Sequence, residues 1–335
     1  MTVSSTKAWE IREQDFPGWL PITEQLRFLL RYAILAPSAR NSQPWRFAVK
    51  DRNVHLFADL TRIQPVADPH ARELYMSLGC ALENLLVAAE HFGLQHAVTF
   101  FPRHDNAKPV ASIAFAPGGT PSAARETIPL RMILRRSSDS RSYRPAQIND
   151  HQWARLKHCC IEPDLRLDLV EDWPTRQCID ALMADADIQT FASREFRREL
   201  AASVGAGAFG TSRPISRLGR LVLSRLDLGP AIARQDRAFL DSAASLGLIS
   251  SREDNHVAHV RAGQLLERVW LTATAVGLNI QPMSRTMQVP EIRAHVAGLF
   301  PKRAWIPQQL FRVGSSRSRG WRRSPRRPLE AVLVT

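Results

Sequence analysis

The chain has 335 residues, of which 44% are apolar and 23% are charged, and it carries a formal net charge of +13. This composition is typical of a globular protein and excludes a collagen-like repeat, a disordered chain and a small disulfide-stapled domain. No run of about 18 apolar residues is present, and the first residues show no apolar leader. We therefore expect a cytoplasmic protein of about two domains, at roughly 150 residues each, with no membrane partner.

The positive charge is concentrated in two segments. Residues 205–237 carry a net +4, and residues 315–328 carry +6. Such arginine clusters can bind nucleic acid, a ligand phosphate or an acidic partner, and the pattern alone leaves these alternatives open. The four cysteines have no metal-binding spacing, and His256 and His259 have no partner at ligand spacing, so we expect no metal.

In the first part of the chain, hydrophobic periodicity predicts helices over 23–35 and 68–93. Thr23 is expected to cap the first helix. Strands are predicted over 46–49, 54–58, 98–101 and 110–116. The sequence Pro117-Gly-Gly-Thr-Pro121 is typical of a linker, and we place the boundary between two halves there.

The second part repeats this alternation of helices and strands. Helices are predicted over 150–160, over 175–200 with a break, and over a long segment ending at Gly277, with strands over 165–170 and 309–313. Asp185 and Asp187 are expected on a solvated helix face. The GxGxxG match at 205–210 follows a helical run rather than a strand, so a glycine hinge is a better interpretation than a dinucleotide site. We expect the adjoining residues 205–255 to form a lid.

The two long helices align with each other without a gap at an offset of 184 residues. Identical residues pair as Gly79 with Gly263, Glu83 with Glu267, and Gly93 with Gly277. Chance agreement between two amphipathic helices is the alternative. We favour duplication of one structural unit within the chain.

Three polar motifs are candidates for ligand binding. In Ala36-Pro-Ser-Ala-Arg-Asn-Ser-Gln-Pro-Trp45, prolines fix the backbone beside small polar groups, which suits a planar heteroaromatic ligand as well as a simple helix stop. Arg135-Arg-Ser-Ser-Asp-Ser-Arg-Ser-Tyr143 offers guanidinium and hydroxyl donors to a phosphate, or forms a solvated loop. Pro325-Arg-Arg-Pro328 holds two arginines between stiff residues, or belongs to a disordered tail.

These motifs occur in an order that resembles a known family. LRYAILAPSARNSQPWRF resembles the helix-and-loop signature of the nitroreductase superfamily, and DPHARELYMSLGCALENLLVAAEHFG resembles its central helix. LLERVWLTATAVGLNIQPMS resembles the same helix with its flavin loop, and PQQLFRVG with SPRRPLEAVL resembles the closing strand and basic strap. The length resembles the Acg-type branch, in which one chain contains two nitroreductase-like halves.

The resemblance implies an α+β fold in which residues 20–120 and 130–335 form an internal pseudo-dimer of two antiparallel-sheet and helix halves. It also implies an FMN-dependent oxidoreductase with NAD(P)H as electron donor and a small nitroaromatic or quinone acceptor, the hydride passing through flavin N5. No catalytic side chain is required, because the flavin carries the chemistry.

The first half has the Ala-Pro-Ser loop and the second has the Arg-x-Ser motif, so the resemblance implies one FMN per chain, bound between the halves. The implied cofactor-binding residues are Pro37, Ser38, Ala39, Asn41, Gln43, Arg136, Ser138, Arg141, Pro282, Met283, Ser284, Arg326 and Arg327. Arg141 lies one position later than in the family pattern. Arg285 occupies a position where ordinary members have glycine.

Two other functions stay open at this stage. A protein that sequesters FMN under a closed lid would keep the same binding residues, whereas a nucleic-acid-binding protein would use the clustered arginines against phosphates. We expect a monomer with an internal pseudo-dimer, with or without further dimerisation, and no nucleic-acid partner.

Overall fold

The computed structural model describes residues 6–102, 108–170, 172–205, 213–300, 304–316 and 323–334. The first half contains an antiparallel sheet of four strands, β1 (Trp45–Lys50), β2 (Asn53–Ala58), β4 (Ala111–Pro117) and β3 (Leu94–Phe100), in that spatial order. Helices α1 (Ile22–Ala33) and α2 (Arg72–His91) pack against it, with α2 buried along nearly its whole length. The predicted α+β class is confirmed.

The second half repeats this topology. Its sheet orders β6 (Leu165–Val170), β7 (Ser245–Ser251), β9 (Ile306–Ser316) and β8 (Asn279–Pro282), with β5 (Tyr143–Arg144) also on β9. The counterpart of α1 is α4 (Asp150–His158), and the counterpart of α2 is α9 (His256–Ala275). Three short helices complete this half, α3 (Arg131–Arg135), α10 (Arg285–Gln288) and α11 (Pro290–Gly298). Strand order and pairing therefore support a duplicated unit.

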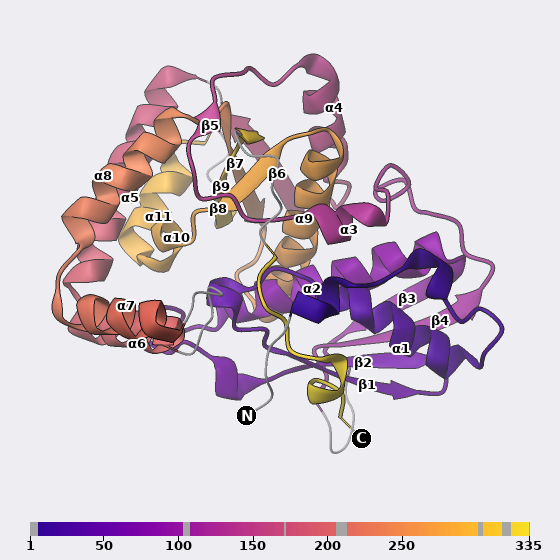
Figure 1. The fold of residues 1–335 in the computed structure, drawn as a ribbon. Helices are drawn as coiled ribbons and strands as arrows, with labels where there is room; N and C mark the ends of the chain where they lie inside the picture. The colour runs from indigo at the N-terminus through magenta and orange to yellow at the C-terminus, as the bar shows by residue number, and fades with distance from the viewer. Residues whose placement is uncertain are drawn as a thin grey trace.

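The halves differ in the connection between their first two strands. In the first half a tight turn at Asp51 and Arg52 joins β1 to β2, with Asp51 at φ 52°. In the second half, four helices are inserted between β6 and β7: α5 (Trp173–Ala192), α6 (Arg194–Gly205), α7 (Arg213–Arg225) and α8 (Gly229–Asp241). In Figure 1, α5 and α8 lie beside the second sheet, and α6 and α7 lie below them at the level of α2.

The predicted lid over 205–255 is wrong at its C-terminal end. Residues 245–251 are strand β7, which pairs with both β6 and β9 and is buried at every position. Most of the glycine-rich segment 205–210 lies outside the described residues.

The two long helices cross where their backbones touch. A β-carbon at Gly79 would lie 1.9 Å from the carbonyl oxygen of Val260, and one at Gly263 would lie 2.0 Å from that of Met76. Both glycines are needed because real side chains cannot approach so closely. Gly93 and Gly277 follow the two helices at φ of +75° and +79°, the left-handed conformation typical of a helix terminus. The paired glycines found in the sequence thus have the same structural role in each half.

The ends of the helices differ in detail from the prediction. The Thr23 cap is wrong, because α1 begins at Ile22 after Pro21, without a side-chain cap. Helix α2 begins at Arg72 rather than at residue 68, and the Asp68 carboxylate accepts a hydrogen bond from the Leu74 amide of its first turn.

The C-terminal segment crosses from the second half to the first. Figure 1 shows residues 323–334, at the yellow end of the colour bar, running down to β1. There the Phe47 amide donates to the Val332 carbonyl and the Val334 amide donates to the Phe47 carbonyl, each at 2.8 Å. We call residues 323–334 the strap.

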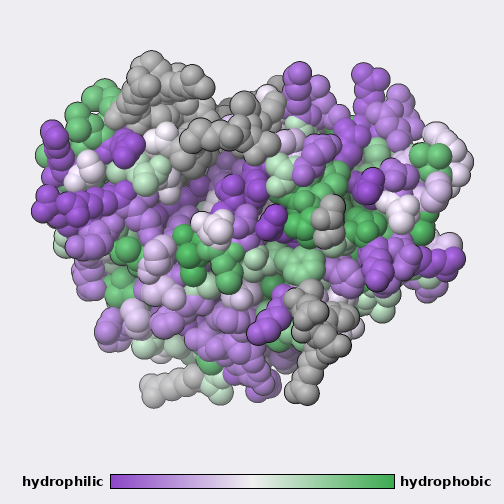
Figure 2. Space-filling model, turned by 90° about the horizontal axis from the view of Figure 1, so that it is seen from below, coloured by the Kyte–Doolittle hydropathy of each residue, from purple (hydrophilic) through white to green (hydrophobic). Residues whose placement is uncertain are grey.

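Hydrophilic side chains cover most of the face seen in Figure 2, and hydrophobic ones form small separate patches there. Among the described helices, none combines the length and apolar character needed to cross a membrane.

The helix crossing can be tested by adding one methyl group. Gly79→Ala is expected to lower the free energy of unfolding by about 1–3 kcal/mol, because the helices must move apart. The matched control is Gly298→Ala on α11, where a β-carbon meets nothing within 4 Å. Urea denaturation of both variants checks the prediction, and equal midpoints would contradict it.

Candidate functional site

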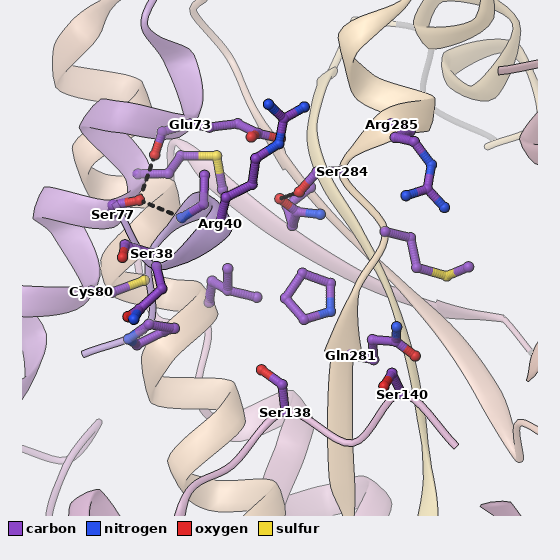
Figure 3. Close-up of a pocket in the computed structure, with 18 of the residues that line it drawn as sticks. Ser38, Arg40, Glu73, Ser77, Cys80, Ser138, Ser140, Gln281, Ser284 and Arg285 are labelled. Carbon is purple, nitrogen blue, oxygen red and sulfur yellow. Dashed lines mark hydrogen bonds between the residues drawn. The ribbon is translucent and has the colours of Figure 1, made fainter. Parts of the chain in front are cut away.

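A cavity of about 520 Å³ lies between the two halves, within the size range of small-molecule sites. The first half contributes the loop after α1 and one face of α2. The second half contributes the segment after α3, the loop after β8 and part of β9 (Figure 3). Ser138 and Ser140 lie on one side of this cavity, with Glu73, Arg40 and Ser284 on the other. The strap reaches it through Ser324 and Arg326.

The loop after α1 is held in an uncommon conformation. Arg40, Asn41 and Gln43 have φ of 48°, 55° and 51°, in a region that non-glycine residues rarely adopt. The Ser38 hydroxyl accepts a hydrogen bond from the Gln43 amide at 3.0 Å, and the Ser77 hydroxyl accepts one from the Ala39 amide at 3.2 Å. This bonding fixes the loop against α2 and turns Pro37–Asn41 toward the cavity.

Two buried arginines form a cationic end of the cavity. Arg136 is 4% exposed and Arg326 is 2% exposed. Both donate to the Leu35 carbonyl at the C-terminal end of α1, at 3.4 and 3.0 Å. Their guanidinium groups lie over the rings of Trp270 and Trp9, at 4.6 and 4.9 Å.

These arginines keep donor capacity for a ligand. Within the described residues, Nε of Arg326 is buried without a hydrogen-bond partner, whereas Nε of Arg136 faces Oε1 of Glu267 in an ion pair that lacks an aligned hydrogen bond. Burial, and then repulsion from Arg136, lowers the pKa of Arg326 to about 9. Glu267 approaches Arg136 at 3.3 Å but is itself a weak counter-charge, because burial raises its pKa to about 7. The donors and the charge therefore suit an anionic group.

The residue equivalent to Glu267 in the first half behaves differently. Glu83 is fully buried and pairs with Arg125 and Arg268 at 2.7 and 2.8 Å. Burial opposes its ionisation, but the two arginines outweigh burial and lower the pKa of Glu83 to about 2. The two equivalent carboxyls thus differ in charge state and role. Glu83 is an ionised carboxylate whose charge is balanced by two arginines of the fold, whereas Glu267 retains its proton more readily and lies next to the cationic end of the cavity.

The loop after β8 forms a further wall of the cavity. Pro282, Met283 and Ser284 line it, and the Met283 amide donates to the Leu310 carbonyl at 2.8 Å. Arg285 also lines the cavity, where it pairs with Asp187 and Asp236 of the inserted helices. The expectation that Asp187 is solvated is wrong: it is 1% exposed, and burial raises its pKa to about 6.

The inserted helices form a roof over the cavity. Their lining residues are mainly apolar and comprise Met183, Asp187, Phe196, Leu200, Asp236 and Phe239. The Arg40 guanidinium pairs with Glu199 of α6 at 3.1 Å and lies over the Phe196 ring at 4.7 Å. Ion pairs from each half, Arg40 with Glu199 and Arg285 with its two aspartates, therefore hold the roof in place.

Comparison with known proteins gives relatives along almost the whole chain. A Mycobacterium tuberculosis protein named "Putative NAD(P)H nitroreductase acg" is 27% identical over 327 residues, covering 95% of this chain and 97% of that protein. A second protein of that organism, also named a putative NAD(P)H nitroreductase, is 28% identical over 302 residues, covering 88% and 86%. These similarities support the expected resemblance of the chain to the nitroreductase superfamily.

No family model matches the chain. Solved structures of nitroreductases show a partial likeness. A Sphingopyxis FMN- and NADPH-dependent nitroreductase has a TM-score of 0.42 and 16% identity, over 61% of this chain and 97% of that chain. The Vibrio harveyi NADPH:FMN oxidoreductase has a TM-score of 0.40 and 13% identity, over 62% and 76%.

Ten of the thirteen residues that the nitroreductase resemblance implied as cofactor-binding line this cavity: Pro37, Ser38, Ala39, Asn41, Arg136, Ser138, Pro282, Met283, Ser284 and Arg326. Three do not line it. The Gln43 side chain bonds to the loop and strap backbones, Arg141 pairs with Asp139 at the surface, and Arg327 bonds to Asp59 and to backbone carbonyls. Neighbouring positions in one motif thus face different surroundings.

Sequence reasoning missed the contribution of α2 to the cavity. Glu73, Ser77 and Cys80 line it from successive turns of this helix. Polar residues four positions apart on an otherwise apolar helix were the available signal.

Aromatic rings pack together at the position that the internal repeat relates to Arg285 in the wall of this cavity. The offset of 184 residues takes Arg285 to Phe101, and Phe101 lies 5.9 Å from Tyr75. Tyr75 in turn stacks on His256 at 4.0 Å. This packing supports a single complete site. No cluster of metal-ligating side chains occurs within the described ranges.

Replacing each of the two equivalent glutamates by glutamine should change the stability of the protein at pH 8 in opposite directions. Glu83→Gln is expected to destabilise the protein on the order of 3 kcal/mol at pH 8, because two buried arginines lose their shared carboxylate.

The free energy of unfolding of Glu267→Gln, relative to that of the wild type, is expected to be higher at pH 8 than at pH 5. An unfolded glutamate ionises near pH 4.3, whereas folded Glu267 keeps its proton to about pH 7, so the wild type loses stability between these values. The variant lacks that loss. Urea denaturation at both pH values provides the measurement, and parallel pH profiles of variant and wild type would contradict the assignment.

Proposed function

We propose that the chain is an FMN-dependent NAD(P)H oxidoreductase of nitroreductase type that reduces nitroaromatic or quinone-like acceptors. The carrying observation is the cavity between the halves, with two buried arginines at one end and a rigid polar loop and the β8 loop along its length. Names of relatives and neighbouring structures that refer to NAD(P)H and FMN support the same class.

The residues present fit FMN. The guanidinium groups of Arg136 and Arg326 both line the cavity and suit a phosphate, because guanidinium donors bind its oxygens with strong charge-assisted hydrogen bonds. Ser138, two residues after Arg136, adds a hydroxyl to the cavity lining, and Pro37–Asn41 and Pro282–Ser284 border further parts of the cavity that can accept the isoalloxazine ring.

When bound, FMN supplies the hydride-transfer chemistry. The protein positions it from both halves, and the apolar roof residues Met183, Phe196, Leu200 and Phe239 exclude water from the reacting face. Because one chain supplies both walls, a monomer is sufficient for one site. We propose residues 20–120 and 130–335 as the two halves of the pseudo-dimer.

The ion pairs that hold the roof favour a second function. Ion pairs hold the inserted helices over the cavity from both sides, so a protein that binds FMN and shields it from donors is the alternative. Anaerobic addition of NADPH to the purified yellow protein separates the two. Bleaching of the flavin absorbance supports the oxidoreductase. A yellow protein that NADPH does not reduce supports shielding, and a colourless protein that takes up no FMN would exclude both.

The cationic end can be tested by FMN titration. Arg326→Ala is expected to raise the dissociation constant for FMN on the order of 10-fold or more, since a buried charge-assisted hydrogen bond is removed. Arg323→Ala, in an exposed position of the same strap, is the control and should bind as the wild type. Because Arg326 also contacts α1, circular dichroism must show an unchanged fold. Wild-type FMN affinity in Arg326→Ala would refute the assignment.

A further inference from the structure

One acidic side chain in the cavity wall has no part in the proposed binding of FMN phosphate. Glu73 lies in the first turn of α2 and is 5% exposed. Its Oε1 atom is buried without a hydrogen-bond partner in the described part of the chain, although the residue lines the cavity. Figure 3 places Glu73 on the side of Ser284, across the cavity from Ser138.

The cations around Glu73 are engaged elsewhere. The Arg72 guanidinium donates to the Gln308 carbonyl, and Arg40 pairs with Glu199 at 3.1 Å. The charged and polar groups that act on Glu73 are Arg72, Asp68, Ser284 and Arg40. Burial is the largest influence and raises the pKa of Glu73, while Asp68 acts in the same direction and Arg72 opposes both. A carboxyl in this setting retains its proton more readily than a solvated one.

A proton donor is needed at this place by the proposed reaction. Reduction of a quinone to a hydroquinone takes one hydride, which carries both electrons, and one proton. Reduction of a nitro group to a nitroso group and water likewise takes one hydride and one proton. The hydride comes from the reduced cofactor, and a carboxyl in the cavity wall can deliver the proton directly to the acceptor.

We propose that Glu73 is the acid that protonates the acceptor, an inference that rests on the proposed oxidoreductase function. The O–H bond of the Glu73 carboxyl breaks and its proton passes to an acceptor oxygen as the hydride is delivered. The carboxylate then takes a proton from water when the product leaves. Glu73 thereby favours acceptors whose reduction consumes a proton at oxygen, such as quinones and nitroaromatics, over acceptors that take up electrons alone.

Isosteric replacement tests this role. Glu73→Gln keeps the shape of the side chain but has no acidic proton. Its rate with a benzoquinone, divided by its rate with ferricyanide, is expected to fall on the order of 100-fold, because ferricyanide accepts an electron without a proton. The pH dependence of the quinone rate should flatten in the same variant, and Glu73→Asp should recover part of the ratio.

A readout independent of turnover accompanies the kinetics. The infrared difference spectrum of wild type minus Glu73→Gln, recorded at neutral pH on the proteins as purified, should show the carbonyl band of a protonated carboxylic acid. Asp185→Asn, at an exposed position on α5, is the control and should leave the rate ratio unchanged and give no such band. FMN affinity, measured by titration, should be equal in all three proteins.

The outcomes separate the two levels of inference. If NADPH fails to reduce the wild-type protein, the oxidoreductase function fails, whatever the state of Glu73. If the wild type turns over but Glu73→Gln keeps its quinone to ferricyanide ratio and its pH profile, Glu73 is not the proton donor. An unchanged FMN affinity together with a lower ratio supports the acid role over a structural one.

Discussion

Direct contact between the backbones of α2 and α9 is the constraint on which the rest of the structure depends. Gly79 and Gly263 lack β-carbons at the crossing, so each helix lies against a carbonyl oxygen of the other. This approach fixes how the two sheets face each other, and with it the distance between the loop after α1 and the loop after β8. The cavity is the space that this geometry leaves between two related halves.

Duplication explains why the site is asymmetric. Equivalent positions in the two halves have diverged, as Glu83 and Glu267 illustrate: the first is neutralised by two arginines of the fold, and the second shares its surroundings with the arginines of the cavity. At the position equivalent to Arg285, Phe101 packs near Tyr75 and His256. Of the two sets of equivalent positions, one thus contributes to packing within the fold, and the other lines the cavity.

Local sequence patterns predicted much of this molecule. The long helices, most strands of the first half and the internal repeat follow from periodicity and glycine spacing, and the nitroreductase resemblance implied ten of the residues that line the cavity. Strand β7 was hidden because residues 245–251 are buried on both faces and show no alternation. The burial of Asp187 depends on Arg285, far away in sequence, and the orientations of Gln43 and Arg327 depend on where the strap meets the loop. Such contacts are set by tertiary packing and leave no local pattern.

The path of the strap has a consequence for the order of folding. Arg326 and the residues that pair with β1, Val332 and Val334, follow the second half in the chain but complete structure that begins with α1 and β1. Because synthesis starts at the N-terminus, a nascent chain exposes the loop after α1 and the edge of β1 while the second half is being made. The cationic end of the cavity forms only when the strap has returned across both halves, so the first half cannot complete this end by itself.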